Sequence, residues 1–222
     1  VQWRVALSKQ KRELAASQNR AQELMVDAVA RVILDQYIQL IMQYDLNVGE
    51  FHEALYAILL KLGTISDLTS EEEEWLRNNW EIEQRLSKHL AIYFERLAAH
   101  NPNNWFLVRA SSYWRRAGDP DQALRVTNYW SSDYYRLESA RLTTRGGAFR
   151  DKRMLCDAEK CGLQALNYNP KDYRPHNLLG AVYIEMGDFV NAEYHFDQAV
   201  ALGSPPREIK REIQRAYRHL GP

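Results

Sequence analysis

The chain has 222 residues, enough for one large domain or two small ones. Lysine and arginine together number 29, as do aspartate and glutamate, so the formal net charge is zero. This balance argues against a surface devoted entirely to nucleic acid, because such surfaces are strongly basic. The longest apolar run, Ala54–Leu60, is too short to cross a bilayer, so we expect no membrane interaction.

The N-terminal region, residues 1–69, is predicted to be helical and to begin with a long helix over residues 4–44. Apolar residues recur there at helical spacing from residue 21 onward. We expect self-association, if it occurs, to use this helix. A second helix is expected over Phe51–Leu62, ended by Gly63. The chain begins with Val, so we expect a fragment or a processed product of something longer. As part of a larger protein, it is expected to be the sensing or assembly module.

Residues 70–103 are predicted to form a helical hairpin, with a degenerate copy of the repeat described below as the alternative, since the segment has about the same length and ends in Asn101-Pro102 as a later copy ends in Asn169-Pro170. Ser70 and Glu73 have the spacing of a capping box at the start of its first helix. The acidic run Glu71–Glu74 is better explained as a solvated first turn than as a cation site. Consecutive helical side chains point about 100° apart, and negative charge is favourable at a helix N-terminus.

A period of 34 residues runs through residues 104–205, which is typical of stacked helix–turn–helix units. The clearest copy, residues 173–205, carries Leu179, Gly180, Tyr183, Ala192, Phe196 and Ala199. The preceding copy carries Leu142, Gly146, Phe149, Ala158, Ala165 and Pro170. The first copy is weaker and carries Ser111, Trp114, Gly118, Ala123 and Thr127.

This pattern resembles the tetratricopeptide repeat (TPR) family, with about three repeats over residues 104–205. The resemblance implies an all-α fold: an N-terminal helical region, a right-handed α-solenoid of TPR-like repeats, and a capping helix over residues 206–222. The physical roles agree, since Gly180 and Ala192 are small where two helices must approach closely. Gly187 can end one helix in the left-handed conformation, and Asp188 can cap the next.

The last helix, expected over Arg207–Leu220, has an apolar stripe and a basic face. The stripe consists of Ile209, Ile213, Ala216, Tyr217 and Leu220. The basic face consists of Arg207, Lys210, Arg211, Arg215 and Arg218. We favour a capping helix with a polar outer side over an anion-binding stripe.

The sequence contains no phosphate-binding glycine loop, nucleophile elbow or zinc-protease motif. We therefore expect no enzymatic activity, no cofactor and no metal. Cys156 and Cys161 are five residues apart, which places them on different faces of a helix. We expect two buried, reduced thiols rather than a disulfide, as in a cytoplasmic protein.

The resemblance also implies a concave groove lined by the first helix of each repeat. Its expected partner-binding residues are Trp105, Ser112, Arg115, Arg116, Arg150, Arg174 and Asn177. Asn177 alone matches the clamp with which some members hold a C-terminal carboxylate, so that clamp is not expected. Arginines on successive repeats suit an acidic peptide or partner, because their forks bind carboxylate or phosphate. Alternatively, they pair internally with Asp151 and Glu185.

The segment 128–136 is dense in aromatic residues: Tyr129, Trp130, Tyr134 and Tyr135. The role that we favour for them is packing between helices, followed by contact with a partner protein and then by stacking on nucleic-acid bases. We predict a scaffold or adaptor that binds a peptide or partner protein through the concave groove. The alternative is a helical-repeat module that binds nucleic acid or another anion through the groove arginines and aromatics.

Overall fold

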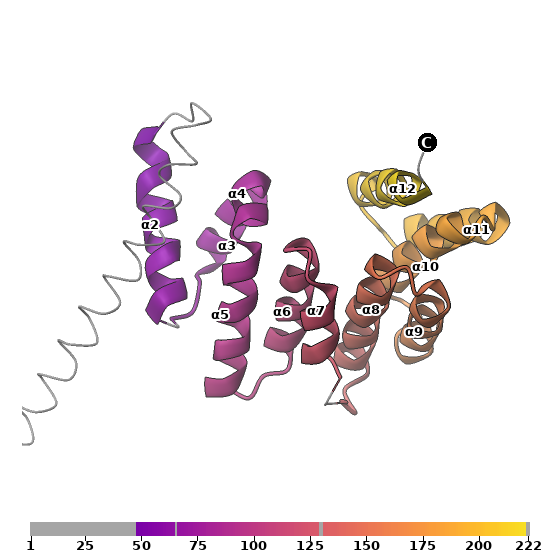
Figure 1. Ribbon diagram of the computed structural model, residues 1–222, viewed down its shortest axis with the longest axis horizontal. Helices are drawn as coiled ribbons and strands as arrows, with labels where there is room; N and C mark the ends of the chain where they lie inside the picture. The colour runs from indigo at the N-terminus through magenta and orange to yellow at the C-terminus, as the bar shows by residue number, and fades with distance from the viewer. Residues whose placement is uncertain (1–47, 65, 129–130, 221–222) are drawn as a thin grey trace, which may run out of the picture. The chain divides into compact units, whose positions relative to one another are not determined.

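A computed structural model describes residues 48–64, 66–128 and 131–220 (Figure 1). All regular structure in this part of the chain is α-helical, which confirms the predicted all-α class. The long helix predicted over residues 4–44, and the self-association expected through it, lie outside the described residues. The helices are α2 (Val48–Thr64), α3 (Ser70–Asn78), α4 (Trp80–Arg85), α5 (Ser87–His100), α6 (Trp105–Arg116), α7 (Pro120–Val126), α8 (Tyr135–Asp151), α9 (Leu155–Tyr168), α10 (Tyr173–Met186), α11 (Phe189–Ala201) and α12 (Pro206–Leu220).

The chain divides into two compact units, residues 1–83 and residues 84–222. In the first unit, α3 begins with a capping box one residue earlier than predicted. Thr69 Oγ1 accepts from the backbone N of Glu72 at 3.2 Å, and the Glu72 carboxylate accepts from the backbone N of Thr69 at 2.7 Å. The box shifts because the helix already includes Ser70, which makes Thr69 the N-cap. Lys61 of α2 also donates to Glu72, at 2.7 Å.

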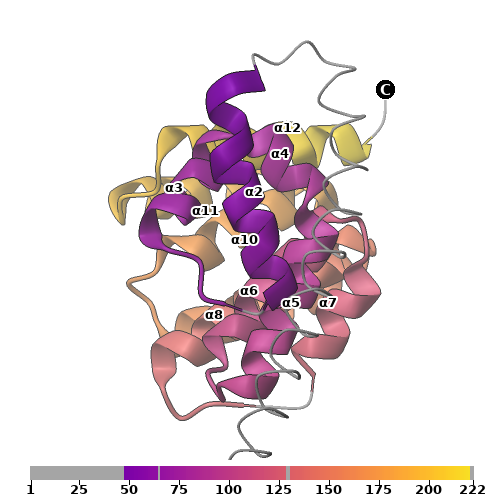
Figure 2. The same ribbon diagram turned by 90° about the vertical axis from the view of Figure 1, so that its left-hand side faces the viewer.

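The second unit contains three consecutive helix pairs, α6–α7, α8–α9 and α10–α11, preceded by α5. Within each pair the two helices contact each other, and α5 packs on α6. The first helices of the pairs also meet in order, α6 against α8 and α8 against α10 (Figures 1 and 2). One side of this unit is therefore formed by α6, α8 and α10, which is where the candidate site lies.

Small residues stand where these helices approach most closely, as the 34-residue pattern predicts. A Cβ atom on Gly180 would lie 2.8 Å from the ring of Phe196 in the paired helix. Ser111, which replaces glycine in the first copy, is completely buried, and its hydroxyl donates to the carbonyl of Ala123 at 3.1 Å. This hydrogen bond thus offsets the cost of burying the Ser111 hydroxyl where the two helices meet.

The turn between α10 and α11 also has the predicted geometry. Gly187 has φ of 80°, a conformation that disfavours other residues. The Asp188 carboxylate then accepts from the backbone N of Asn191 at 3.1 Å, which caps α11.

Helix α12 packs on α10 through part of its predicted apolar stripe. Ile209, Ile213 and Ala216 join the cluster around Phe196. Tyr217 does not belong to this contact: it is 53 % exposed, because it lies about 100° around the helix from the completely buried Ala216. Of the basic face, Arg207, Lys210, Arg211 and Arg218 are exposed, whereas Arg215 turns inward.

The two cysteines are free thiols, as predicted, but only Cys161 is buried. Cys156 is exposed because the five-residue offset turns it away from the face that α9 packs inward. No helix within the described ranges is long and apolar enough to span a membrane.

Candidate ligand-binding groove

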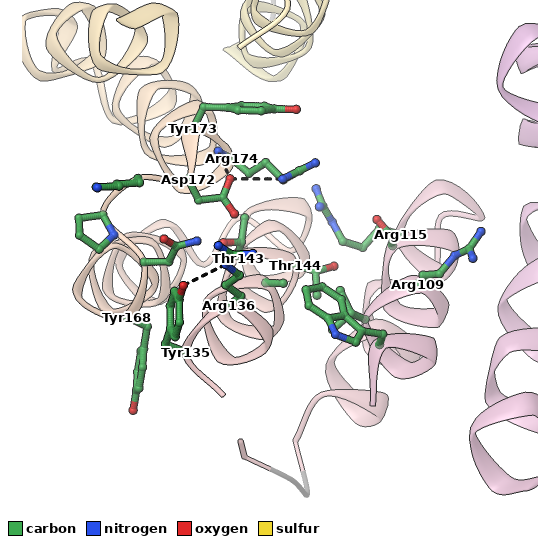
Figure 3. A pocket seen from close by; sticks show the side chains of 17 residues that line it. Arg109, Arg115, Tyr135, Arg136, Thr143, Thr144, Tyr168, Asp172, Tyr173 and Arg174 are labelled. Carbon is green, nitrogen blue, oxygen red and sulfur yellow. Dashed lines mark hydrogen bonds and ion pairs between the residues drawn. The ribbon is translucent and has the colours of Figure 1, made fainter. Parts of the chain in front are cut away.

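A groove of about 960 Å³ lies between α6, the first half of α8 and the loop that joins α9 to α10 (Figure 3). Helix α6 contributes one face, with side chains three or four residues apart. The lining residues of α6 are Trp105, Val108, Arg109, Ser112 and Arg115. Those of α8 are Tyr135, Arg136, Ala140, Thr143 and Thr144. The end of α9, the loop and the start of α10 supply Tyr168, Asn169, Pro170, Lys171, Asp172, Tyr173 and Arg174.

The groove is strongly basic although the whole chain is neutral. Among the described residues that line it, Asp172 is the one acidic side chain. The basic side chains are Arg109, Arg115, Arg136, Lys171 and Arg174. Helix α8 begins here without a capping side chain, so the positive end of its dipole adds to the potential. The groove is suited to a negatively charged ligand.

The exposed cations at its opening retain most of their donor capacity. Arg136 Nε donates to the Tyr135 hydroxyl at 3.0 Å, and this hydrogen bond is the main reason that the pKa of Arg136 is raised (Figure 3). Arg174 Nη1 lies 3.4 Å from an oxygen of Asp172. Within the described part of the chain, neither Arg136 nor Lys171 pairs with a carboxylate. Ligand acceptors can therefore be bound without breaking a strong internal ion pair.

Arg115, at the inner end of the groove, is held in place from two sides. Its Nε donates to Asp151 at 2.7 Å, and its side chain is only 17 % exposed. Its guanidinium also lies against α8 at Gly147, where a Cβ atom would overlap it. Glycine at this position is thus required for the observed Arg115 conformation, and the ion pair fixes its direction.

Behind Arg115, a charge network joins α8, α10 and α12. Arg150 Nε donates to Glu185 and its Nη1 to Glu212, both at 2.6 Å. Asp151 accepts from Arg215 of α12 at 2.9 Å, in addition to its bond with Arg115. This network ties the last helix to the side of the unit that carries the groove.

The network also shifts the pKa values of Glu212 and Arg150. Burial alone would raise the pKa of Glu212, but Arg150, Arg115 and Arg215 outweigh it and lower that pKa. The pKa of Arg150 is raised, since Glu212 and Glu185 outweigh the opposing effect of burial. The Glu212 carboxylate and the Arg150 guanidinium thus stabilise each other in the charged form.

Arg150 is therefore not a groove residue, contrary to the sequence-based expectation. It is 1 % exposed and pairs with Glu185 and Glu212, and none of these three residues lines the groove. Arg150 instead forms an internal ion pair with Glu185, and Arg115, which also lines the groove, forms one with Asp151. These pairs correspond to the alternative predicted from the sequence. The reason is α12, whose Glu212 approaches from 62 residues away in sequence.

The other predicted partner-binding residues divide into two groups. Trp105, Ser112, Arg115 and Arg174 line the groove. Arg116 and Asn177 do not. The guanidinium of Arg116 lies 5.0 Å from the ring centroid of Tyr113, and the buried Asn177 amide donates to Ser204 Oγ at 2.8 Å.

The aromatic stretch contributes one residue to the groove. Tyr135 lines it, while the adjacent Tyr134 is 49 % exposed outside the lining, with the two ring centroids 5.6 Å apart. Both tyrosines are exposed rather than packed between helices. Tyr129 and Trp130 lie outside the described residues.

Several lining residues were not identified from the sequence. Arg109 was detectable, because it is four residues from Trp105 and shares its helical face. Arg136 is adjacent to the aromatic Tyr135. Tyr168 and Lys171 carried no comparable signal, since their segment reads only as a helix end and a turn.

Comparison with protein-family models and with curated proteins gave no match to this chain. The resemblance to the tetratricopeptide repeat thus rests on the 34-residue period and its signature residues. Nor is there, in the part of the chain that the structure describes, a group of three or more His, Cys, Asp or Glu side chains suited to a metal ion.

Proposed function

We propose that this chain is a TPR-like binding module, a right-handed α-solenoid that acts as a scaffold or adaptor rather than as an enzyme. Its groove would hold an acidic segment of a partner protein. The observation that carries this proposal is the charge of the lining, which contains five arginine and lysine side chains and one acidic side chain, Asp172. Opposite charges across an interface speed association and exclude wrongly charged partners.

Aromatic side chains beside these cations support a protein ligand. Trp105 is 39 % exposed and Tyr168 is 47 % exposed, and both line the groove. Tryptophan, tyrosine and arginine are the residues that most often anchor protein interfaces. The groove volume of about 960 Å³ is large enough for several residues of a peptide.

The free thiols support a reducing compartment, and we propose that the module works in the cytoplasm. In a longer protein, such a module would recruit partners for sensing or assembly. The helix pairs α6–α7, α8–α9 and α10–α11 provide the rigid support that a preformed groove needs.

A second candidate is the binding of single-stranded nucleic acid. The specific observation in its favour is the combination of Tyr135, Tyr168 and Tyr173 with arginines in one groove. Bases stack on such aromatic rings while the backbone phosphates contact the cations. This binding would weaken steeply with added salt.

The test is affinity purification from a lysate of the native source, with and without nuclease. Three baits are compared: the wild-type chain, Arg136→Glu/Lys171→Glu in the groove, and Lys210→Glu/Arg211→Glu on the exposed face of α12. The two variants have the same charge change, so their difference reports the groove. We expect a discrete partner that survives nuclease, is lost with the groove variant and stays with the control.

Two results would oppose the proposal. Equal recovery of the partner by all three baits would exclude the groove as its binding site. Recovery of nucleic acid, with loss of bound protein after nuclease, would favour the second candidate.

A further inference from the structure

The cations of the groove form two groups that differ in exposure. Arg109 and Arg115 are half-buried, and Arg109 lies with its guanidinium 4.1 Å from the ring centroid of Phe94. Arg136, Lys171 and Arg174 line the same groove and are exposed. The second group is defined here as the opening triad, because its exposure makes it accessible to a ligand from solvent.

The opening triad comes from three different segments: the first turn of α8, the α9–α10 loop and the first turn of α10. Arg136 and Arg174 lie on different helices that border the same pocket (Figure 3). Asp172 is the acidic residue beside them, and one of its oxygens also accepts from the backbone N of Arg174 at 3.0 Å. Three positive charges against one negative charge leave an excess of two.

Resting on the function proposed above, we propose that the opening triad binds a phosphorylated side chain within the acidic partner segment. A phosphomonoester carries close to two negative charges at neutral pH and presents three acceptor oxygens. It therefore matches both the excess charge and the number of cations. A single carboxylate would neutralise only half of that excess.

The hydrogen bonding of the triad fits this ligand. The Tyr135 hydroxyl occupies Arg136 Nε, which orients the guanidinium and leaves its two terminal nitrogens as a donor fork. Such forks bind phosphate in a bidentate manner. The 3.4 Å approach of Arg174 to Asp172 is long for a charge-assisted bond, so a phosphate dianion can compete for this guanidinium. Lys171 adds a flexible point charge.

A nucleic acid fits the triad less well. Each phosphodiester carries a single charge, and successive phosphates lie along a strand, so they favour cations spread along a track. Here the exposed cations all line one pocket, and the chain as a whole is neutral.

The test uses three degenerate peptide libraries with acidic flanks that are identical except at one fixed central residue: phosphoserine, serine or glutamate. Binding to the folded chain is measured by fluorescence anisotropy at constant salt, with a single-stranded oligonucleotide as a fourth probe. We expect the phosphoserine library to bind at least about tenfold more tightly than the other two, as charge-assisted bonds from the triad require. Lys171→Glu should abolish this preference, and the exposed control Lys210→Glu should keep it.

The other outcomes separate this proposal from the function on which it rests. Equal, Lys171-dependent binding of the phosphoserine and glutamate libraries would overturn the phosphate assignment and leave an acidic-peptide groove. Binding of none of the peptides would overturn both. Oligonucleotide binding that Lys171→Glu abolishes, without phosphopeptide binding, would also overturn both in favour of nucleic acid.

Discussion

Replacing Arg150 by methionine tests whether this arginine is part of the structural support or a ligand contact. The side chain is 1 % exposed and donates to both Glu185 and Glu212 at 2.6 Å. After substitution, the fully buried Glu185 carboxylate would keep its bond from Arg153, a side chain that is 46 % exposed. Leaving a buried charge without its main partner costs about 3–5 kcal/mol. We expect Arg150→Met to lower the free energy of unfolding by that amount.

The assay is urea unfolding at neutral pH, followed by circular dichroism and tryptophan fluorescence. Arg211→Met is the matched control: Arg211 is exposed on α12, so its loss should change stability by no more than about 0.5 kcal/mol. The double variant Arg150→Met/Glu185→Gln should recover part of the loss, because the fully buried residue 185 then carries no charge and only the partly exposed Glu212 lacks its Arg150 partner. A cost below about 1 kcal/mol for Arg150→Met would refute the buried network and restore Arg150 as a candidate groove residue.

Three further predictions concern stability. Gly146→Ala should destabilise by about 1 kcal/mol in urea unfolding, because the new Cβ would lie 2.7 Å from Leu178 and overpacking exceeds the gain in helix propensity. For Gly147→Ala, the free energy of unfolding in the same assay should stay within about 1 kcal/mol of wild type, because the new Cβ meets only the flexible end of Arg115. Displacing Arg115 should nevertheless weaken the binding of an acidic peptide. A large loss of stability would contradict this prediction. Burial and the neighbouring His176 lower the pKa of His195 from 6.5 to about 4. As the pH falls from 6.5 towards 4, the unfolded chain binds a proton that the folded chain does not. The free energy of unfolding should therefore fall by up to about 3 kcal/mol over this range. His195→Phe should flatten that slope in unfolding curves, and an unchanged slope would show that other groups cause it.

The sequence was sufficient to predict the all-α class and the close helix contacts, because both depend on local pattern. Gly180 against Phe196 and the Gly187–Asp188 turn follow from residue size and backbone freedom alone. The capping box was misplaced by one residue, since Thr69 and Ser70 are chemically equivalent caps and only the start of the helix decides between them.

The groove was less predictable because it depends on contacts between distant segments. Arg115 and Arg174 were identified through their repeat positions, whereas Lys171 lies in a turn whose residues carry no helical pattern. Arg150 was misplaced because its partner Glu212 comes from α12. Periodicity indicates which face of a helix a side chain occupies, but it does not show which other helix covers that face.

Backbone hydrogen exchange tests the central claim most directly. Exchange would be measured by mass spectrometry for the chain alone and with a saturating acidic peptide that the binding assay has identified. We predict slower exchange in segments 135–144 and 168–174, together with α6, and no change in α11. Protection confined to α11 or to the exposed face of α12, with the groove segments unaffected, would contradict the proposal that this groove is the binding site.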